Sequence, residues 1–359
     1  YYGTATGSVE VDDGAGATCS ITLSGGSGSC DLTSTSAGSK TITADYSGDG
    51  VYNPSSETDV HNVFKLATTT TITGDDLDPS TVGQSYSVSV AVDAAYGIPT
   101  GTVGVNDGSG ASCTATLSGG SGSCDLTSSS AGSKTLTASY SGDANYNASS
   151  DIETHTVAKS ASTTTITSDS PEPSFVGQSY IVAVTVAGSF GAPTGTVGIS
   201  DGSATCTATL GGSGTGSCSL ISTTIGEKTL TANYSGDGVY NTSTGTATHN
   251  VNKSGSNTAI ISDTPDPSYV GQSYLVSVNV TGSYGLAAGT VNIADGSGAT
   301  CSITLADGSG SCSLTSTSAG TKTLTADYSG SSVYNTSTGT ASHTVSKSAS
   351  TTTITNDSP

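Results

Sequence analysis

Arginine, methionine and tryptophan are absent from this chain of 359 residues, and phenylalanine occurs only three times. Acidic residues outnumber lysines by 28 to 8, which gives a formal net charge of −20. Nucleic acids and anionic membranes recruit proteins through basic patches, so this composition argues against both as partners. No apolar run approaches the roughly 18 residues that a membrane-spanning helix needs, so membrane insertion is not expected.

Small residues dominate the chain instead, with 48 Gly, 66 Ser and 62 Thr. Such a composition is common in disordered segments, but here apolar residues alternate with Ser and Thr, as in SYSVSVAV at 85–92 and KTLTASY at 134–140. A period of two places one face of each segment in a core, and no apolar stripe of helical period persists. We therefore predict an all-β protein.

The chain is an internal repeat with a step of 94 residues. The segment VGQSY begins at Val82, Val176 and Val270. The four histidines keep the same step and are His61, His155, His249 and His343. A unit of this length is typical of one small sandwich domain.

Within residues 161–254 the pattern predicts seven strands separated by Gly-rich and Asp-Gly turns. Seven short strands favour an immunoglobulin-like β-sandwich over a closed barrel. Because linkers such as 159–161 are short, we predict a beads-on-a-string, extended array of such domains. The predicted strands are 163–168, 178–187, 195–200, 204–210, 216–221, 227–234 and 244–251.

The repeat frame predicts a chain cut from a longer array. Tyr2-Gly3 aligns with Tyr96-Gly97, so the first copy lacks its first two strands, including the counterpart of SYSVSVAV. We expect that its open face is covered by the same longer chain or by a neighbouring subunit of a filament. The predicted units are a partial repeat at 1–66, complete repeats at 67–160, 161–254 and 255–348, and the first strand of a further repeat at 349–359.

Cysteines occur as one pair per repeat, and each pair flanks a Gly/Ser turn, as in CTATLSGGSGSC. This spacing predicts a disulfide between residues that face each other across neighbouring strands of a hairpin. Zinc is not expected, since CxxC clusters and nearby histidines are missing. Four disulfides indicate an extracellular or cell-surface location. The predicted bonds join Cys19 with Cys30, Cys113 with Cys124, Cys206 with Cys218, and Cys301 with Cys312.

The segment LTANYSGDGVYNTSTGTATHNV at 230–251 recurs at 42–63 and 136–157, and PTGTVGISDG lies at 193–202. In these motifs the whole chain resembles the bacterial Ig-like tandem-repeat domains. The resemblance implies an Ig-like fold and a role in stalks, adhesin shafts or surface fibres, without catalysis. The Cys–Trp–Cys core pattern of antibody domains is absent.

No catalytic residue, cofactor or metal ligand is predicted. Each repeat holds one His, and Ser is too abundant for a local Ser/His pair to be informative. We expect His155 and its counterparts to be structural or surface residues. The motif GSGSC is interpreted as a hairpin turn and not as a nucleotide-binding loop.

Two series of acidic residues recur. The first precedes Gly at hairpin corners, where Asp-Gly favours a turn: Asp13, Asp107, Asp201 and Asp295. The second lies near the domain junctions, either as solvated acids or as calcium ligands, and the lack of an Asp-x-Asp-x-Asp loop favours the former. Its members are Asp75, Asp169, Asp263 and Asp357, joined by Asp78, Glu172 and Asp266.

One lysine per repeat opens the strand predicted at 227–234 and its counterparts. Such a lysine either protects a sheet edge or forms a Lys–Asn isopeptide crosslink. The series is Lys40, Lys134, Lys228 and Lys322.

The function predicted from the sequence is structural: an array that forms a stalk, fibre or filament shaft on the cell surface, with neighbouring copies of itself as partners. The alternative is an adhesin whose repeats bind a glycan or a surface through exposed tyrosines, with avidity from repetition. Exposure of the second tyrosine of each pair decides between them. The pairs are Tyr46/Tyr52, Tyr140/Tyr146, Tyr234/Tyr240 and Tyr328/Tyr334.

Overall fold

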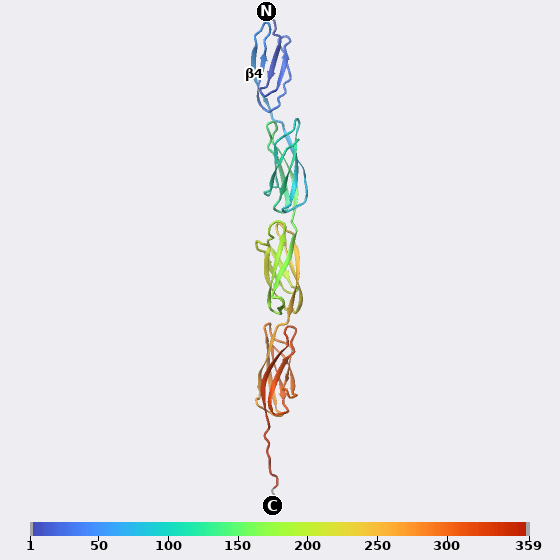
Figure 1. Ribbon diagram of the computed structural model, residues 1–359, viewed down its shortest axis with the longest axis vertical. Coiled ribbons are helices and arrows are strands. Elements are labelled where there is room, and N and C mark those ends of the chain that lie inside the picture. The colour runs from blue at the N-terminus through green and yellow to red at the C-terminus, as the bar shows by residue number, and fades with distance from the viewer. Residues whose placement is uncertain (1–2, 357–359) are drawn as a thin grey trace. The chain divides into compact units, whose positions relative to one another are not determined.

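The computed structural model describes residues 3–356, and all of its regular elements are β-strands (Figure 1). Residues 67–160 form eight strands in two sheets. The strands are β5 (Thr68–Asp75), β6 (Ser80–Thr81), β7 (Ser85–Ala94), β8 (Thr102–Asn106), β9 (Ser112–Thr116), β10 (Ser121–Thr127), β11 (Gly132–Tyr140) and β12 (Ser149–Ala158).

The two sheets of this repeat have the strand orders β10-β7-β5 and β6-β12-β11-β8-β9. Neighbouring strands are antiparallel, except that β6 runs parallel to β12, with Ser80 opposite Val157 and Thr81 opposite Ala158. An early segment of the repeat therefore pairs directly with its last strand.

The next two repeats have the same sheet orders. The seven strands predicted in residues 161–254 are present within two residues of their predicted bounds, and β14 was not predicted. It is two residues long and pairs with β20, far along the chain, so no local periodicity reveals it. The strands are β13 (Ser162–Ser170), β14 (Ser174–Phe175), β15 (Ser179–Gly188), β16 (Thr196–Ser200), β17 (Thr205–Thr209), β18 (Thr215–Ile221), β19 (Gly226–Tyr234), β20 (Ser243–Asn252), β21 (Ser256–Thr264), β22 (Ser268–Tyr269), β23 (Ser273–Gly282), β24 (Thr290–Ala294), β25 (Thr300–Thr304), β26 (Ser309–Thr315), β27 (Gly320–Tyr328) and β28 (Ser337–Ser346).

Each core lies between the two sheets and follows the alternation of the sequence. In β7, Tyr86, Val88, Val90 and Val92 are buried, while the serines between them are not. Valine, leucine, alanine and tyrosine fill all three complete cores. Small apolar residues and a few buried tyrosine rings therefore fill the cores in the absence of Trp and Met.

Disulfide bonds join the two cysteines of every repeat, in the pairs predicted from the sequence. The S–S distances are 1.93–2.03 Å and the Cα–Cα distances 5.9–6.2 Å. The bonds are Cys19 to Cys30, Cys113 to Cys124, Cys206 to Cys218, and Cys301 to Cys312.

The position of these bonds in the fold differs from the prediction. Cys113 lies in β9 and Cys124 in β10, which are edge strands of different sheets. The prediction that paired cysteines face each other across one hairpin is therefore wrong, because the chain crosses between the layers in the intervening turn. Each bond fastens one sheet to the other. The same correction holds for Cys206 in β17 with Cys218 in β18, and for Cys301 in β25 with Cys312 in β26.

The first repeat consists of one sheet, β2-β1-β3-β4, formed by β1 (Ser8–Asp12), β2 (Thr18–Thr22), β3 (Gly38–Tyr46) and β4 (Ser55–Val63). Residues 27–33 have the same sequence, SGSCDLT, as β10, yet they form no strand. Among the described strands, β10 pairs with β7 alone, and the first repeat has no counterpart of β7. An open hollow of about 650 Å³, lined by Val11, Ile21 and Leu32 among others, lies on this face.

Residues 349–356, which belong to the segment predicted as the first strand of a further repeat, form no strand for the same reason. The remaining residues of that prediction, including Asp357, lie outside the described part of the chain. Between residues 3 and 356, no helix has the length and apolar character needed to cross a membrane.

Candidate functional site

Each complete repeat contains a histidine with no exposed surface in its last strand, and both ring nitrogens have partners. In residues 67–160, His155 Nδ1 lies 2.5 Å from Asp75 Oδ2, and its Nε2 lies 2.8 Å from Ser80 Oγ. The corresponding distances are 2.7 and 2.7 Å around His249, and 2.7 and 2.8 Å around His343.

A second carboxylate lies beside the same Nδ1. The distance to Nδ1 is 3.8 Å for Asp78, 2.6 Å for Glu172 and 3.5 Å for Asp266. We call the histidine, the serine and the two acids of a repeat the histidine clasp. The three clasps are Asp75, Asp78, Ser80 and His155; Asp169, Glu172, Ser174 and His249; and Asp263, Asp266, Ser268 and His343.

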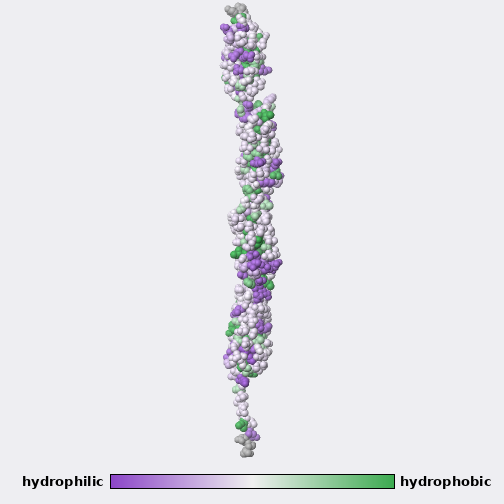
Figure 2. Space-filling model, in the orientation of Figure 1, coloured by the Kyte–Doolittle hydropathy of each residue, from purple (hydrophilic) through white to green (hydrophobic). Residues whose placement is uncertain are grey.

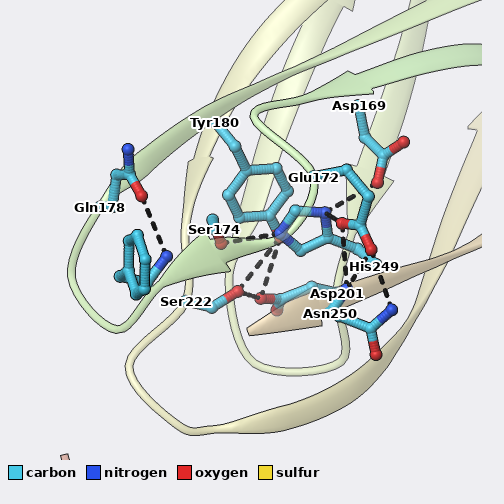
Figure 3. Close-up of polar contacts among 10 residues, drawn as sticks. Asp169, Glu172, Ser174, Gln178, Tyr180, Asp201, Ser222, His249 and Asn250 are labelled. Carbon is cyan, nitrogen blue, oxygen red and sulfur yellow. Dashed lines mark hydrogen bonds and ion pairs between the residues drawn. The ribbon is translucent and has the colours of Figure 1, made fainter. Parts of the chain in front are cut away.

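The second acid is held in place by the backbone of the last strand (Figure 3). The amide of Asn250 donates to Glu172 at 3.0 Å, and the Asn250 side chain donates to Glu172 Oε1 at 2.9 Å. The amides of Thr156 and Thr344 donate to Asp78 and Asp266 at 2.8 and 2.9 Å. In every clasp this acid is therefore tied to the residue that follows the histidine.

A tyrosine ring stacks on the histidine of each clasp. The ring centroids of Tyr86 and His155 lie 3.9 Å apart, with 11° between the planes, and the pairs Tyr180/His249 and Tyr274/His343 are similar. The Tyr86 hydroxyl lies 3.1 Å from Ser128 Oγ, and Ser128 donates to Asp107 Oδ2 at 2.8 Å. Asp107 also accepts the amides of Ser109 and Ala111, which closes the β8–β9 turn.

The Asp-Gly series thus forms turns, as predicted. In the three complete repeats the carboxylates of Asp107, Asp201 and Asp295 are also the buried ends of a polar chain that leads to the clasp. Burial by itself raises the pKa of Asp201, but hydrogen bonds from Ser222, Ala204 and Ser203 outweigh it and lower the pKa to about 2. A carboxylate accepting several donors is stabilised in its charged form. This residue therefore stays ionised inside the fold at neutral pH.

The fold positions the clasp through its topology. The segment 75–82 leaves β5 in one sheet and reaches β6 at the edge of the other, beside β12. Further bonds follow on the same path, with Val82 N donating to Ala158 O at 3.0 Å and Ser160 Oγ donating to Val82 O at 2.8 Å. The clasp therefore joins the N-terminal segment of a repeat to its C-terminal strand.

The order Ser Oγ, His Nε2, His Nδ1 and Asp oxygen matches the connectivity of a hydrolase triad. A nucleophile and its general base must reach a substrate, but Ser80, Ser174, Ser268 and the three histidines have no exposed surface. The arrangement is suited to holding two strands together and not to acyl transfer.

The structure changes several sequence-based interpretations. The first acid of each clasp bonds a buried histidine, so the prediction of solvated junction acids is wrong for Asp75, Asp169 and Asp263. His61 of the first repeat is exposed, because the covering sheet is missing there. Asp75 and His155 are 80 residues apart, and their counterparts keep this separation in the other complete repeats. In a strict repeat, however, any two recurring residues keep a constant separation, so the spacing could not identify this pair as a contact.

Lysine and tyrosine predictions are corrected as well. Lys134 is buried in β11, an interior strand of its sheet, so the edge interpretation is wrong; its Nζ donates to Ser130 Oγ at 2.7 Å. The second tyrosines of the complete repeats, Tyr146, Tyr240 and Tyr334, are buried. Their rings offer no exposed face for stacking on a sugar, which removes the basis of the glycan-binding alternative in these repeats.

One solved structure, which aligns along almost the whole chain, supports the fold. A tetra-tandem repeat in the extending region of a large adhesion protein is 18% identical, with a TM-score of 0.57, covering 96% of this chain and 92% of that one. Invasin, a bacterial integrin-binding protein, is 17% identical, with a TM-score of 0.37, covering 79% of this chain and 60% of that one.

A Ca²⁺-stabilized adhesin that helps an Antarctic bacterium bind ice is 19% identical, with a TM-score of 0.27, covering 96% of this chain and 91% of that one. No curated protein matches the chain significantly. The family of bacterial Ig-like domains, group 3, matches at residues 2–63, 72–158, 166–252 and 261–346. Together with the repeated two-sheet sandwiches, these four matches show that the chain belongs to the bacterial Ig-like domain family, group 3.

Proposed function

We propose that this chain is a spacer segment of a bacterial surface adhesin or fibre, which carries tension between neighbouring repeats. The observation that supports this role is the histidine clasp, together with the parallel pairing of β6 and β12. Tension along the chain enters a repeat at its first strand and leaves at its last. Bonds between parallel segments at these two ends are loaded in shear, so they resist together and do not open one at a time.

Hydrogen-bonded linkers support the same role. Between β20 and β21, Ser254 N donates to Val333 O and Asn335 N donates to Ser254 O, both at 2.9 Å. Before β5, Leu66 forms the same pair of bonds with Asn145 and Asn147. Tyr284 covers Gly177 of the preceding repeat so closely that a Cβ atom there would come within 1.8 Å of the ring. A spacer needs junctions of this kind to transmit direction from one repeat to the next.

The disulfides and the surface fit an extracellular setting. Disulfides persist in oxidising compartments, outside the cytoplasm. On the visible face, hydrophobic residues are scattered and form no large continuous patch (Figure 2). With a net charge of −20, such a surface favours solubility over self-association. We therefore place the chain outside the cell as part of a larger repeat array.

Electron microscopy of metal-shadowed particles tests the proposal. The chain is compared with versions in which residues 161–254 are duplicated once and twice. A spacer lengthens by a constant step of about 30–40 Å per added repeat. This step follows from the length of its longest strands, which have nine or ten residues with a rise of about 3.3 Å per residue. Compact particles whose longest dimension does not grow with repeat number would contradict the proposed role.

A further inference from the structure

The clasps also bring one imidazole nitrogen and two carboxylates together. We propose that each complete repeat binds one divalent transition-metal ion, with Zn²⁺ as the representative, between histidine Nδ1 and the two acids of its clasp. The three ligand sets are Asp75, Asp78 and His155; Asp169, Glu172 and His249; and Asp263, Asp266 and His343. Ion binding is a property of each repeat and does not depend on the spacer role.

The donor atoms already lie at near-ligand spacing. In each set, the ligand atoms are all within 4.8 Å of one another. In residues 161–254, Asp169 Oδ2 and Glu172 Oε2 lie 2.7 and 2.6 Å from the same Nδ1. Tetrahedral Zn²⁺ with bonds of about 2.0–2.2 Å separates its ligands by roughly 3.3 Å, so side-chain shifts of less than about 1 Å complete the site.

Charge favours a cation over a proton at this position. A single proton on histidine Nδ1 can form one good hydrogen bond, to one of the two clasp carboxylates. The two carboxylates then face each other with no hydrogen-bond donor between them. A divalent ion binds both oxygens and offsets both charges. Two lysines of these repeats bond to serines outside the ligand sets, Lys134 to Ser130 and Lys322 to Ser318.

The residues around the histidine hold its ring and the second acid in an orientation suited to metal binding. Metal-binding histidines commonly bond through their other nitrogen, which fixes the tautomer and the ring orientation. Here Nε2 bonds the buried Ser80 Oγ, and when it donates, the lone pair of Nδ1 points toward the acids. The stacked Tyr86 fixes the ring plane, and the Thr156 amide orients Asp78.

Ligand type and access indicate which ions fit. Calcium and magnesium prefer oxygen ligands, whereas imidazole with carboxylates suits zinc and its neighbours in the first transition series. The side chain of Asp78 is 41% exposed, that of Asp75 11% and that of His155 0%. An ion therefore enters past the second acid, and water completes its coordination from the solvent side.

The bound ion would connect the segment 75–78 with β12, across the same two ends that the clasp joins. The first repeat is an internal control, because His61 has no counterparts of Asp75 and Asp78 within the chain. The proposal therefore predicts three sites in the 359-residue chain and not four.

Titration of the metal-free chain with Zn²⁺, in competition with a fluorescent chelator, counts the sites. We expect three equivalents for the unchanged chain and two for Asp78→Asn. The control Asp93→Asn removes the same charge from an exposed residue near the C-terminal end of β7, and this variant should still bind three equivalents. Ser80→Ala should weaken one of the three sites by about 10- to 100-fold, as expected for loss of a bond to a ligating histidine.

Co²⁺ absorption and imidazole ¹⁵N shifts identify the ligand, and circular dichroism verifies that the variants are folded. Perturbation of Nδ1 in three histidines but not in His61 supports the site. Absence of saturable binding, or a stoichiometry unchanged by Asp78→Asn in a folded chain, would overturn the proposal. Neither result bears on the particle length that tests the spacer role.

Discussion

At the scale of single residues, the loop aspartate of the SGD motif depends most clearly on its charge. Asp143 accepts bonds from the amides of Thr100, Asn145 and Tyr146 and from the Thr100 hydroxyl, at 2.7–3.1 Å. In the fourth repeat Ser331 takes this place and accepts the amides of Val333 and Tyr334 at 3.2 and 3.1 Å. The chain thus contains a charged and a neutral version of one loop.

This contrast predicts a pH dependence. Burial raises the pKa of Asp143, but the hydrogen bonds from Thr100, Asn145 and Tyr146 outweigh it and lower the pKa to about 2. Because this value lies below that of an unfolded aspartate, about 3.9, the charged form stabilises the fold above pH 4, and this stabilisation is lost as the pH falls toward 2.

Thermal unfolding of the chain and of Asp143→Ser between pH 2 and pH 7 measures the effect. The stability difference between the two should be largest at neutral pH and should shrink steadily as the pH falls from 4 toward 2. A difference that stays constant over this range would show that the carboxylate charge has no part in holding the loop.

His155→Ala gives a second prediction at this scale. The substitution leaves Ser80 and Asp75 without their buried partner and removes the ring that stacks on Tyr86. Each unsatisfied buried group costs about 1–3 kcal/mol, so the repeat should lose several kcal/mol of unfolding free energy. The control His61→Ala changes an exposed histidine and should stay within about 0.5 kcal/mol. Equal effects of the two substitutions in denaturant unfolding would contradict the account of the clasp.

At the scale of strands, the alternation of apolar and polar residues predicted the individual long strands. It could not predict the features that depend on which strands pair with one another. The seven long strands of residues 161–254 were predictable because Val, Ile and Tyr alternate with Ser and Thr. Strand β14, the position of the Cys113–Cys124 bond between two sheets, and the contact of Asp75 with His155 all depend on which distant strands become neighbours. Residues 27–33 are the clearest example, because the identical seven-residue sequence forms a strand at residues 121–127 but forms no strand at residues 27–33.

Restoring the missing partner should restore that strand. Fusing a copy of residues 67–94 ahead of Tyr1 supplies counterparts of β5, β6 and β7. Residues 27–33 should then pair with the new β7 counterpart and become protected in amide hydrogen exchange. Unprotected amides in a folded fusion protein would show that the lack of a partner is not what prevents this strand from forming.

At the scale of the whole molecule, the disulfides limit how far each repeat lengthens under force. Cys113 and Cys124 are 11 residues apart in sequence, and their Cα atoms lie 5.9 Å apart. Reduction frees this loop, which reaches about 36–40 Å when extended, so each unfolding step should lengthen by about 30–35 Å. The loops closed by Cys218 and Cys312 span 12 and 11 residues and should add similar lengths. Single-molecule pulling with and without reductant measures the step, and an unchanged step would contradict a closed disulfide within the repeat.

The central claim is that the histidine clasp and the β6–β12 pairing resist tension applied to the two ends of a repeat. Single-molecule force spectroscopy of the chain tests it most directly, with His155→Ala compared against a core variant such as Val103→Ala in β8, which touches neither β6 nor β12 in the sheet order. Core truncation lowers the unfolding free energy by a comparable few kcal/mol. The account predicts that one repeat of the His155→Ala chain unfolds at a clearly lower force than in the Val103→Ala chain. Equal unfolding forces at equal loss of stability would contradict it.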